Sequence, residues 1–183
     1  DSPTNNFCTL NPLDKNSGME LFEGNLKAAG SSGGEEVRGT ISQNSGKWYF
    51  EMYVVTRDTG ENIVFGVGNI APTEIDSVYA NGIAYRTDAL KYVLSASSSS
   101  YGATWTTGDI MGVAMNLDDE EVTFYKNDAT QGAISFTLGT NVFTPFFRPG
   151  GVSQTDDVVF NFGSDSSFAG NVTAQGNQDD NDI

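Results

Sequence analysis

Histidine is absent from this chain of 183 residues, and cysteine occurs once, at Cys8. The absence of histidine excludes the usual Ser-His-Asp and Cys-His forms of nucleophilic catalysis, and it removes the commonest transition-metal ligand. The single cysteine excludes an internal disulfide and leaves the redox compartment undecided. We therefore expect no cofactor and no metal site.

Basic residues are also scarce, with 9 Lys and Arg against 24 Asp and Glu, which gives a net charge of −15. A duplex phosphate backbone and an anionic membrane surface would both repel such a chain. No apolar run approaches the roughly 18 residues that span a bilayer. The sequence predicts neither nucleic-acid binding nor membrane insertion.

Aromatic residues are plentiful, with 12 Phe and 7 Tyr, and they favour β-strands. They fall in short apolar or alternating segments that turn residues separate about every 8–12 positions, as in a sandwich or barrel. No segment keeps a helical apolar stripe for three turns, and the best short-helix candidate is 72–77. The sequence thus predicts an all-β fold. Its expected strands are 37–41, 47–55, 62–67, 82–85, 91–94, 110–115, 121–126, 133–136, 142–147 and 158–162.

Three short patterns have a chemical alternative to a structural role. The GxGxxA pattern at 66–71 could cradle a pyrophosphate, but Pro72 follows it directly and no long helix does, so close packing at a strand end is favoured. Asp118 and Asp119 could bind Ca²⁺, although a solvated hairpin tip is the favoured interpretation. The serine run at 97–100 has no base partner for nucleophilic catalysis.

Glu74 and Asp76 form a further candidate, because alternating carboxylates on a strand point to one face, as a retaining glycosidase needs. The segment resembles the catalytic strand of sandwich-fold β-glucanases. The third acid of that pattern is missing here, since Tyr79 stands in its place. A polar turn is therefore the favoured interpretation.

A series of short motifs runs in order over 46–163. The motifs are GKWYFE (46–51), FGVG (65–68), YG (101–102), TGDIMGV (107–113), NLD (116–118), VTFYKND (122–128), GAISF (132–136), FTP (143–145) and NFG (161–163). This series resembles the SPRY domain, and the resemblance implies a concanavalin A-like jelly roll of two antiparallel sheets. Asp109 is expected to accept hydrogen bonds from backbone donors at a strand entry. Asp128 stands where the family prefers Gly after Asn127, and both residues tolerate positive φ.

SPRY domains are binding modules without catalytic groups, so the resemblance implies that this chain is not an enzyme and binds through loops on a rigid sandwich. Tyr and Trp give a large contact area at little entropy cost, with core packing as the alternative for each ring. Trp48 is expected in the core, where its replacement by alanine would cost about 3–5 kcal/mol. The loop residues expected at the binding site are Arg57, Asp58, Tyr79, Tyr85, Tyr101 and Trp105.

Residues 4–12 and 23–26 resemble the lead-in of bacteriophage-encoded SPRY proteins, and 161–171 resemble their exit. This resemblance implies a tail fibre, capsid fibre or capsid decoration at the virion surface. Such a protein would serve adhesion or assembly by binding other virion proteins or a host-surface protein or glycan, and it would form homo-oligomers by analogy with virion fibres. Two alternatives stay open: a glycan-binding lectin, with Ca²⁺ at Asp118 and Asp119, and a glycoside hydrolase that uses Glu74 and Asp76.

The expected organisation has three parts. Residues 1–36 form an irregular lead-in with edge strands at 21–22 and 25–28. Residues 37–163 form the SPRY-like sandwich. Residues 164–183 form a polar, acidic tail or a linker to further chain.

Overall fold

Burial alternates along the strands, and the longest strand shows why this sequence builds a two-sided sheet. In β5 (Lys47–Thr56), Phe50, Met52 and Val54 are buried, whereas the residues between them are partly exposed. Successive side chains of a strand point to opposite faces, so β5 turns one face to a core and the other to solvent. The computed structural model describes residues 6–31, 34–58, 62–70, 81–94, 96–150 and 155–173.

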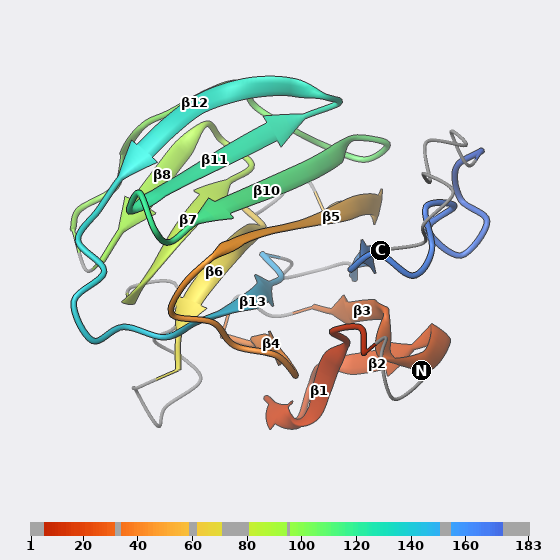
Figure 1. Ribbon diagram of the computed structural model, residues 1–183. Helices are drawn as coiled ribbons and strands as arrows, with labels where there is room; N and C mark the ends of the chain where they lie inside the picture. The colour runs from red at the N-terminus through yellow and green to blue at the C-terminus, as the bar shows by residue number, and fades with distance from the viewer. Residues whose placement is uncertain are drawn as a thin grey trace.

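The described strands form two antiparallel seven-stranded sheets, as the sequence predicts (Figure 1). The β6 sheet has the order β1 (Leu10–Lys15), β4 (Val37–Gly39), β13 (Phe143–Arg148), β6 (Val64–Asn69), β7 (Gly82–Arg86), β8 (Leu90–Val93) and β9 (Ser99–Ser100). The β5 sheet has the order β12 (Ala129–Ser135), β11 (Glu121–Lys126), β10 (Ile110–Asn116), β5, β14 (Asp156–Asn161), β3 (Lys27–Gly30) and β2 (Glu20–Phe22). A single 3-10 turn, η1 (Glu23–Asn25), joins β2 to β3.

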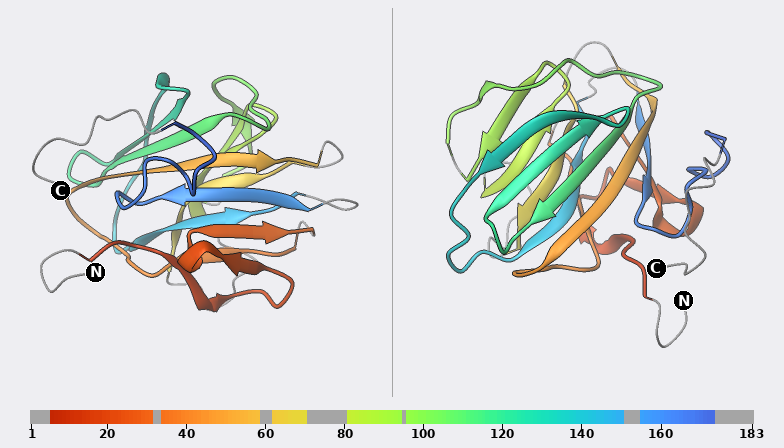
Figure 2. Two further views of the ribbon diagram at one scale, coloured as in Figure 1. Left: turned by 90° about the vertical axis from the view of Figure 1, so that its right-hand side faces the viewer. Right: turned by 45° about the horizontal axis from the view of Figure 1, so that its top comes forward.

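Aromatic rings from both sheets fill the space between them. Phe65 of β6 and Phe124 of β11 meet edge to face with their ring centroids 5.4 Å apart, and Phe147 of β13 meets Phe160 of β14 at 6.4 Å. All four side chains are fully buried. Such ring pairs add to the free energy gained from area burial, so they hold the two layers of Figure 2 together.

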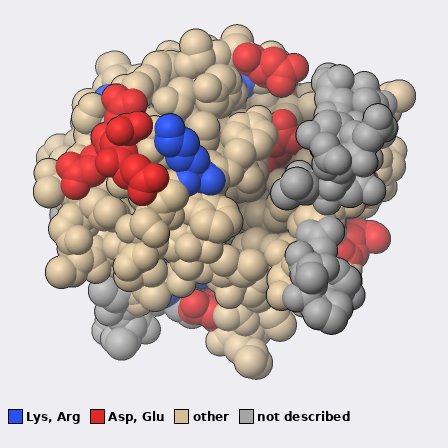
Figure 3. All heavy atoms as spheres, in the orientation of Figure 1, with Lys and Arg blue, Asp and Glu red and all other residues tan. Residues whose placement is uncertain are grey.

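Two hairpins predicted from the sequence are confirmed. β10 and β11 pair in continuous register, with Asp118 and Asp119 exposed at their turn. Asn127 and Asp128 join β11 to β12, and both have positive φ, 47° and 65°. The acidic side chains at the β10–β11 turn contribute to the red patch on the left of Figure 3.

Trp48 corrects the expectation of a buried residue. It shares the parity of the buried Phe50 on β5, yet its side chain is 45 % exposed and its indole N–H donates to the Ser45 carbonyl at 2.8 Å. The second residue of β5 lies at the end of the sandwich, beyond the cover of the opposite sheet. The expected loss of 3–5 kcal/mol on its replacement by alanine therefore does not apply.

The N-terminal segment contributes strands to both sheets. The short strands expected at 21–22 and 25–28 are present as β2 and β3, while β1 forms where the sequence predicted irregular chain. The boundary at 36/37 stays a prediction. In the C-terminal segment, the buried Phe168 packs on Tyr53 of β5, with 6.0 Å between ring centroids.

Several expectations fall outside the described residues. They are the short helix at 72–77, the carboxylate pair Glu74 and Asp76, and the loop residue Tyr79. Among the residues that the structure describes, no helix has the length and hydropathy needed to cross a membrane.

Candidate binding surface

Several loops meet at one end of the sandwich, where β5 ends and β6 begins. Backbone hydrogen bonds join them: the Thr87 N–H donates to the Ile63 carbonyl at 3.1 Å, and the Trp105 N–H donates to the Thr87 carbonyl at 3.2 Å. The Gly108 N–H donates to the Val54 carbonyl at 2.8 Å. We call this surface the loop end, and it consists of 57–58, 62–63, 87–89, 101–109 and 127–128.

The aromatic residues expected to be exposed here are instead buried. Tyr85 is 0 %, Trp105 1 % and Tyr101 8 % exposed. The Tyr85 ring lies 5.0 Å from that of Tyr101 and 6.1 Å from that of Trp105, and the Tyr85 hydroxyl donates to the Ala103 carbonyl. These rings fill the space under the 101–109 loop, so core packing, the alternative weighed for each ring, holds for all three, and they offer no exposed ring to a partner. The three rings support the 101–109 loop from inside the core.

The exposed part of the 101–109 loop is made of small residues. The side chains of Tyr101 and Trp105 point inward, and the residues around them present backbone groups, methyl groups and hydroxyls to solvent. The exposed residues are Gly102, Ala103, Thr104, Thr106, Thr107 and Gly108.

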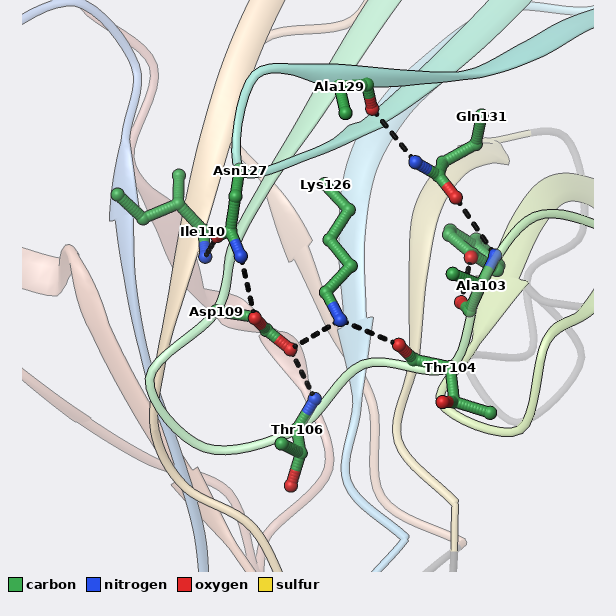
Figure 4. A network of polar contacts seen from close by, with 10 residues as sticks. Ala103, Thr104, Thr106, Asp109, Ile110, Lys126, Asn127, Ala129 and Gln131 are labelled. Carbon is green, nitrogen blue, oxygen red and sulfur yellow. Dashed lines mark hydrogen bonds and ion pairs between the residues drawn. The ribbon is translucent and has the colours of Figure 1, made fainter.

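Asp109 holds the second half of this loop (Figure 4). One carboxylate oxygen accepts from the Thr106 N–H at 2.8 Å and lies 3.2 Å from the Lys126 ammonium, while the other accepts from the Asn127 amide at 2.8 Å. The Lys126 ammonium also donates to the Thr104 carbonyl at 2.8 Å. The expected role of Asp109 as an acceptor for backbone donors is confirmed.

Gln131 of β12 holds the first half. Its side-chain oxygen accepts from the Ala103 N–H at 2.9 Å, and its amide donates to the Ala129 carbonyl at 2.8 Å (Figure 4). Gly102 has φ +56°, and a Cβ there would lie 2.6 Å from the Tyr85 hydroxyl oxygen. The loop is thus fixed from below by rings and from one side by the β11–β12 hairpin.

Arg57 and Asp58 both lie at the loop end. The Arg57 N–H donates to the Thr107 hydroxyl at 2.9 Å, and its guanidinium donates to the Asn62 side chain at 3.4 Å. Asp58 is only 4 % exposed, and its N–H donates to the buried Asp156 carboxylate at 2.7 Å. Arg57 is partly exposed and can contact a partner, whereas Asp58 is buried among the loops.

Basic residues gather around the loop end. Four of the nine in the chain, Arg57, Arg86, Lys91 and Lys126, lie on these loops or the adjoining strand ends. Arg86 donates from two guanidinium nitrogens to Asp88, and these hydrogen bonds hold the pKa of Asp88 below its usual value. Asp58, Asp88, Asp109 and Asp128 lie on the same loops, so the formal charges balance there. An acidic partner would therefore meet less repulsion at the loop end than over the rest of this chain of net charge −15.

Comparison with known proteins bears on the identity of this scaffold. Residues 47–165, well over half of the chain, match the family profile described as "SPRY domain". The chain belongs to the SPRY domain family. SPRY domains mediate protein–protein contacts and are usually non-catalytic.

Curated relatives of this SPRY domain include two Ran-binding proteins. Ran-binding protein 9 of Xenopus tropicalis is 27 % identical over 145 residues, and Ran-binding protein 10 of Danio rerio is 26 % identical over 145 residues. Each match covers 72 % of this chain. The chain spans only 26 % and 24 %, about a quarter, of these two relatives.

Solved structures agree with the fold of this SPRY domain. The SPRY domain of human HERC1 superimposes with a TM-score of 0.68 at 15 % identity, over 82 % of this chain and 96 % of that one. The TRIM65 PSpry domain superimposes with a TM-score of 0.64 at 14 % identity, over 85 % and 90 % of the two chains. At these identities the likeness shows the fold alone.

The buried tyrosines of this SPRY domain predict a loss of stability at high pH. Burial raises the pKa of Tyr85 and of Tyr101 from 10 to about 12. The unfolded chain loses these protons near pH 10, while the folded chain keeps them. The contribution of the two tyrosines to the free energy of unfolding is therefore fully present below pH 10 and is lost as the pH rises to 12. Urea denaturation at several pH values between 8 and 12 measures this fall.

A matched variant isolates the two rings. In the double variant Tyr85→Phe, Tyr101→Phe, the free energy of unfolding should fall less steeply between pH 10 and 12 than in the wild type. Some fall should persist, because burial and Glu51 also raise the pKa of Tyr49. Equal slopes in variant and wild type would contradict the assignment.

The acidic β10–β11 turn uses its carboxylates within the protein. Asp118 accepts from the Gly46 N–H at 2.8 Å, and Asp119 accepts from the Asn116 amide at 2.6 Å. In the part of the chain that the structure describes, no group of three or more His, Cys, Asp or Glu side chains is placed to hold a metal ion. Calcium binding at Asp118 and Asp119 stays an open alternative to the favoured solvated turn.

Sequence reasoning found the loop but missed three residues that position it. Lys126, Asn127 and Gln131 lie on the β11–β12 hairpin and form hydrogen bonds to the loop across 18 to 28 positions of sequence. The family motif at 122–128 contains Lys126 and Asn127, so it could have pointed to both. No signal in the sequence pointed to Gln131.

Proposed function

We propose that this SPRY domain is a non-catalytic module that binds a protein partner through the loop end. The observation that carries the proposal is the construction of the 101–109 loop. Its exposed residues are small, its inward rings are buried, and Asp109 and Gln131 fix its two halves from the side. A loop that is already ordered before binding loses little conformational entropy when a partner docks.

The chemistry of the surface favours a protein segment as partner. The hydroxyls of the exposed Thr104 and Thr106 offer hydrogen bonds to a peptide backbone, and the partly exposed Arg57 can pair with a carboxylate. We infer a partner whose contact segment is extended and includes acidic residues.

Selection from a random peptide library displayed on phage, followed by calorimetric titration, tests this function. Peptides selected on the wild type should bind the variant Thr104→Glu, Thr106→Glu at least tenfold more weakly, because both exposed side chains would obstruct the surface and repel acidic residues of the peptide. The backbone bonds of Thr104 and Thr106 to Lys126 and Asp109 would remain. Asn44→Glu, exposed at the opposite end of the sandwich, is the matched control and should bind as the wild type does.

The position of bound peptide gives a second readout. Amide chemical shifts in NMR spectra should change at 101–109 on titration. Selected peptides that bind the loop variant as tightly as the control, or that shift amides of another surface, would contradict the proposal.

We also propose that the module acts at the surface of a bacteriophage particle, in a fibre or a capsid decoration. The support is the resemblance of 4–12, 23–26 and 161–171 to segments of phage-encoded SPRY proteins. The Ran-binding relatives, from a frog and a fish, lend this placement no support. Mass spectrometry and immunogold labelling of purified particles test it, and absence of the chain from the particles would overturn it.

A further inference from the structure

The two sheets have four outer strands, and three of them are unsuited to pairing with another chain. β9 has two residues and β2 has three. β1 carries Pro12 and two charged residues, and its register with β4 is irregular. Short length, proline, charge and irregular register are the features by which natural sheets keep their edges from associating.

The fourth edge, β12, has one of these features, because its register with β11 shifts between Thr123 and Tyr125, but its residues 133–135 pair with β11 in continuous register. It is seven residues long, its sequence is ATQGAIS, and it contains no charged residue and no proline. Six of its side chains are exposed or partly exposed. The right-hand view of Figure 2 shows β12 along one margin of the β5 sheet, where no other described strand pairs with its outer side.

The hydrogen-bond pattern of β12 shows which backbone groups point outward. The Phe136 N–H donates to the Glu120 carbonyl at 3.0 Å, so this pair belongs to the bonded positions of the ladder. Bonded and non-bonded pairs alternate in an antiparallel ladder. Ser135, opposite Glu121, and Ala133, opposite Thr123, are therefore non-bonded toward β11, and their N–H and C=O groups point away from the sheet.

We propose that β12 is a homodimer interface, which pairs antiparallel with β12 of a second copy of this chain about a two-fold axis at Ile134. In this register Ala133 lies opposite Ser135 of the second copy, and the reverse pair is its symmetry mate. Each pair exchanges two N–H···O=C bonds, so the two outward-pointing residues supply four. The two β5 sheets become one continuous sheet.

The side chains are compatible with this register. Ala133 and Ser135 are small and exposed, so they do not obstruct a neighbouring strand on the outer face. Gly132 comes opposite the second copy's Phe136 and has no side chain that could obstruct that ring. The sequence is thus complementary to itself when it is reversed about Ile134.

The charges allow two copies of an acidic chain to meet at this edge. The acid nearest to the outward-pointing groups is Glu121 on β11, opposite Ser135. In the dimer the two Glu121 side chains are three strand spacings apart, about 14 Å, beyond the Debye length of about 8 Å at physiological salt. Asp128 precedes β12. Because the two β12 strands run antiparallel, the Asp128 side chains of the two copies lie at opposite ends of the interface. Figure 3 shows acidic side chains near the two ends of the upper margin along which β12 runs in Figure 1, and mostly uncharged atoms between them.

Sedimentation velocity of the full chain over a wide concentration range tests the proposal. We expect a concentration-dependent monomer–dimer equilibrium. Ala133→Pro removes the outward N–H and leaves the ladder to β11 intact, so it should weaken the dimer at least tenfold. Ala133→Lys places two like charges near each other across the axis and should have the same effect even if the proline variant folds poorly.

Asn44→Lys is the matched control. It makes the same change of charge at an exposed site away from β12, and its dimer should match that of the wild type. Hydrogen exchange gives a local readout, because the amides of Ala133 and Ser135 should become protected as the dimer forms. A monomer at every concentration, or a dimer that both Ala133 variants leave unchanged, would overturn the proposal, and either result would leave the loop-end function standing.

Discussion

Replacing Trp105 with alanine is expected to lower the free energy of unfolding by about 3–5 kcal/mol. The side chain is 1 % exposed and meets the rings of Phe65 at 5.4 Å and Tyr85 at 6.1 Å. Its removal leaves a cavity beneath the 101–109 loop, and the surrounding rings can collapse into it only in part. The 101–109 loop should also lose order, which hydrogen exchange at its amides would detect.

The other tryptophan supplies the control for this experiment. Trp48 is 45 % exposed, so Trp48→Ala should cost about 1 kcal/mol or less. Urea denaturation followed by far-ultraviolet circular dichroism measures both variants. Equal losses in the two variants would mean that Trp105 is not the central ring of this core.

Replacing Gly66 with alanine is expected to lower the free energy of unfolding by more than about 3 kcal/mol, at the upper end of overpacking effects. A Cβ at this position would lie 2.2 Å from the Ile83 carbonyl oxygen and 3.0 Å from the Ala84 Cα. Both are backbone atoms of the neighbouring strand β7 and cannot rotate aside. The predicted role of the glycine motif in close packing is confirmed for Gly66.

Gly112→Ala provides the comparison, because it makes the same change within a strand of the β5 sheet. There the Cβ would meet the Tyr49 hydroxyl at 2.5 Å, the far end of a side chain that is 54 % exposed and can move. We expect a smaller loss for Gly112→Ala, measured by thermal and urea unfolding. A loss as small at Gly66 as at Gly112 would show that β6 and β7 can separate to admit the methyl group.

The strands of this fold could be predicted because their signal is local. Alternation along β5 and the Asp118–Asp119 turn between β10 and β11 depend on neighbours in sequence. β1 and the two-residue β9 were missed, since neither carries an aromatic or β-branched run and both exist only through pairing with other strands. Trp48 was expected in the core of the same strand, but its local sequence does not indicate that the side chain stays 45 % exposed.

The binding surface was predictable only in outline. Five of the six expected residues lie at or beneath the loop end, and the sixth, Tyr79, lies outside the described residues. The sequence did not predict which of these side chains are exposed. The burial of Tyr85 and Tyr101 depends on hydroxyl contacts with Ala103 and Gly132, which are 18 and 31 positions away along the chain.

The 101–109 loop divides its residues between two tasks. Tyr101, Trp105 and Asp109 maintain its shape, while the short side chains between them face outward and contribute little to the core. Substitutions at the outward positions, other than Gly102 and Gly108 with their positive φ, should therefore leave the fold intact. Under the proposed function, a designer could exchange these positions to give the domain a new specificity.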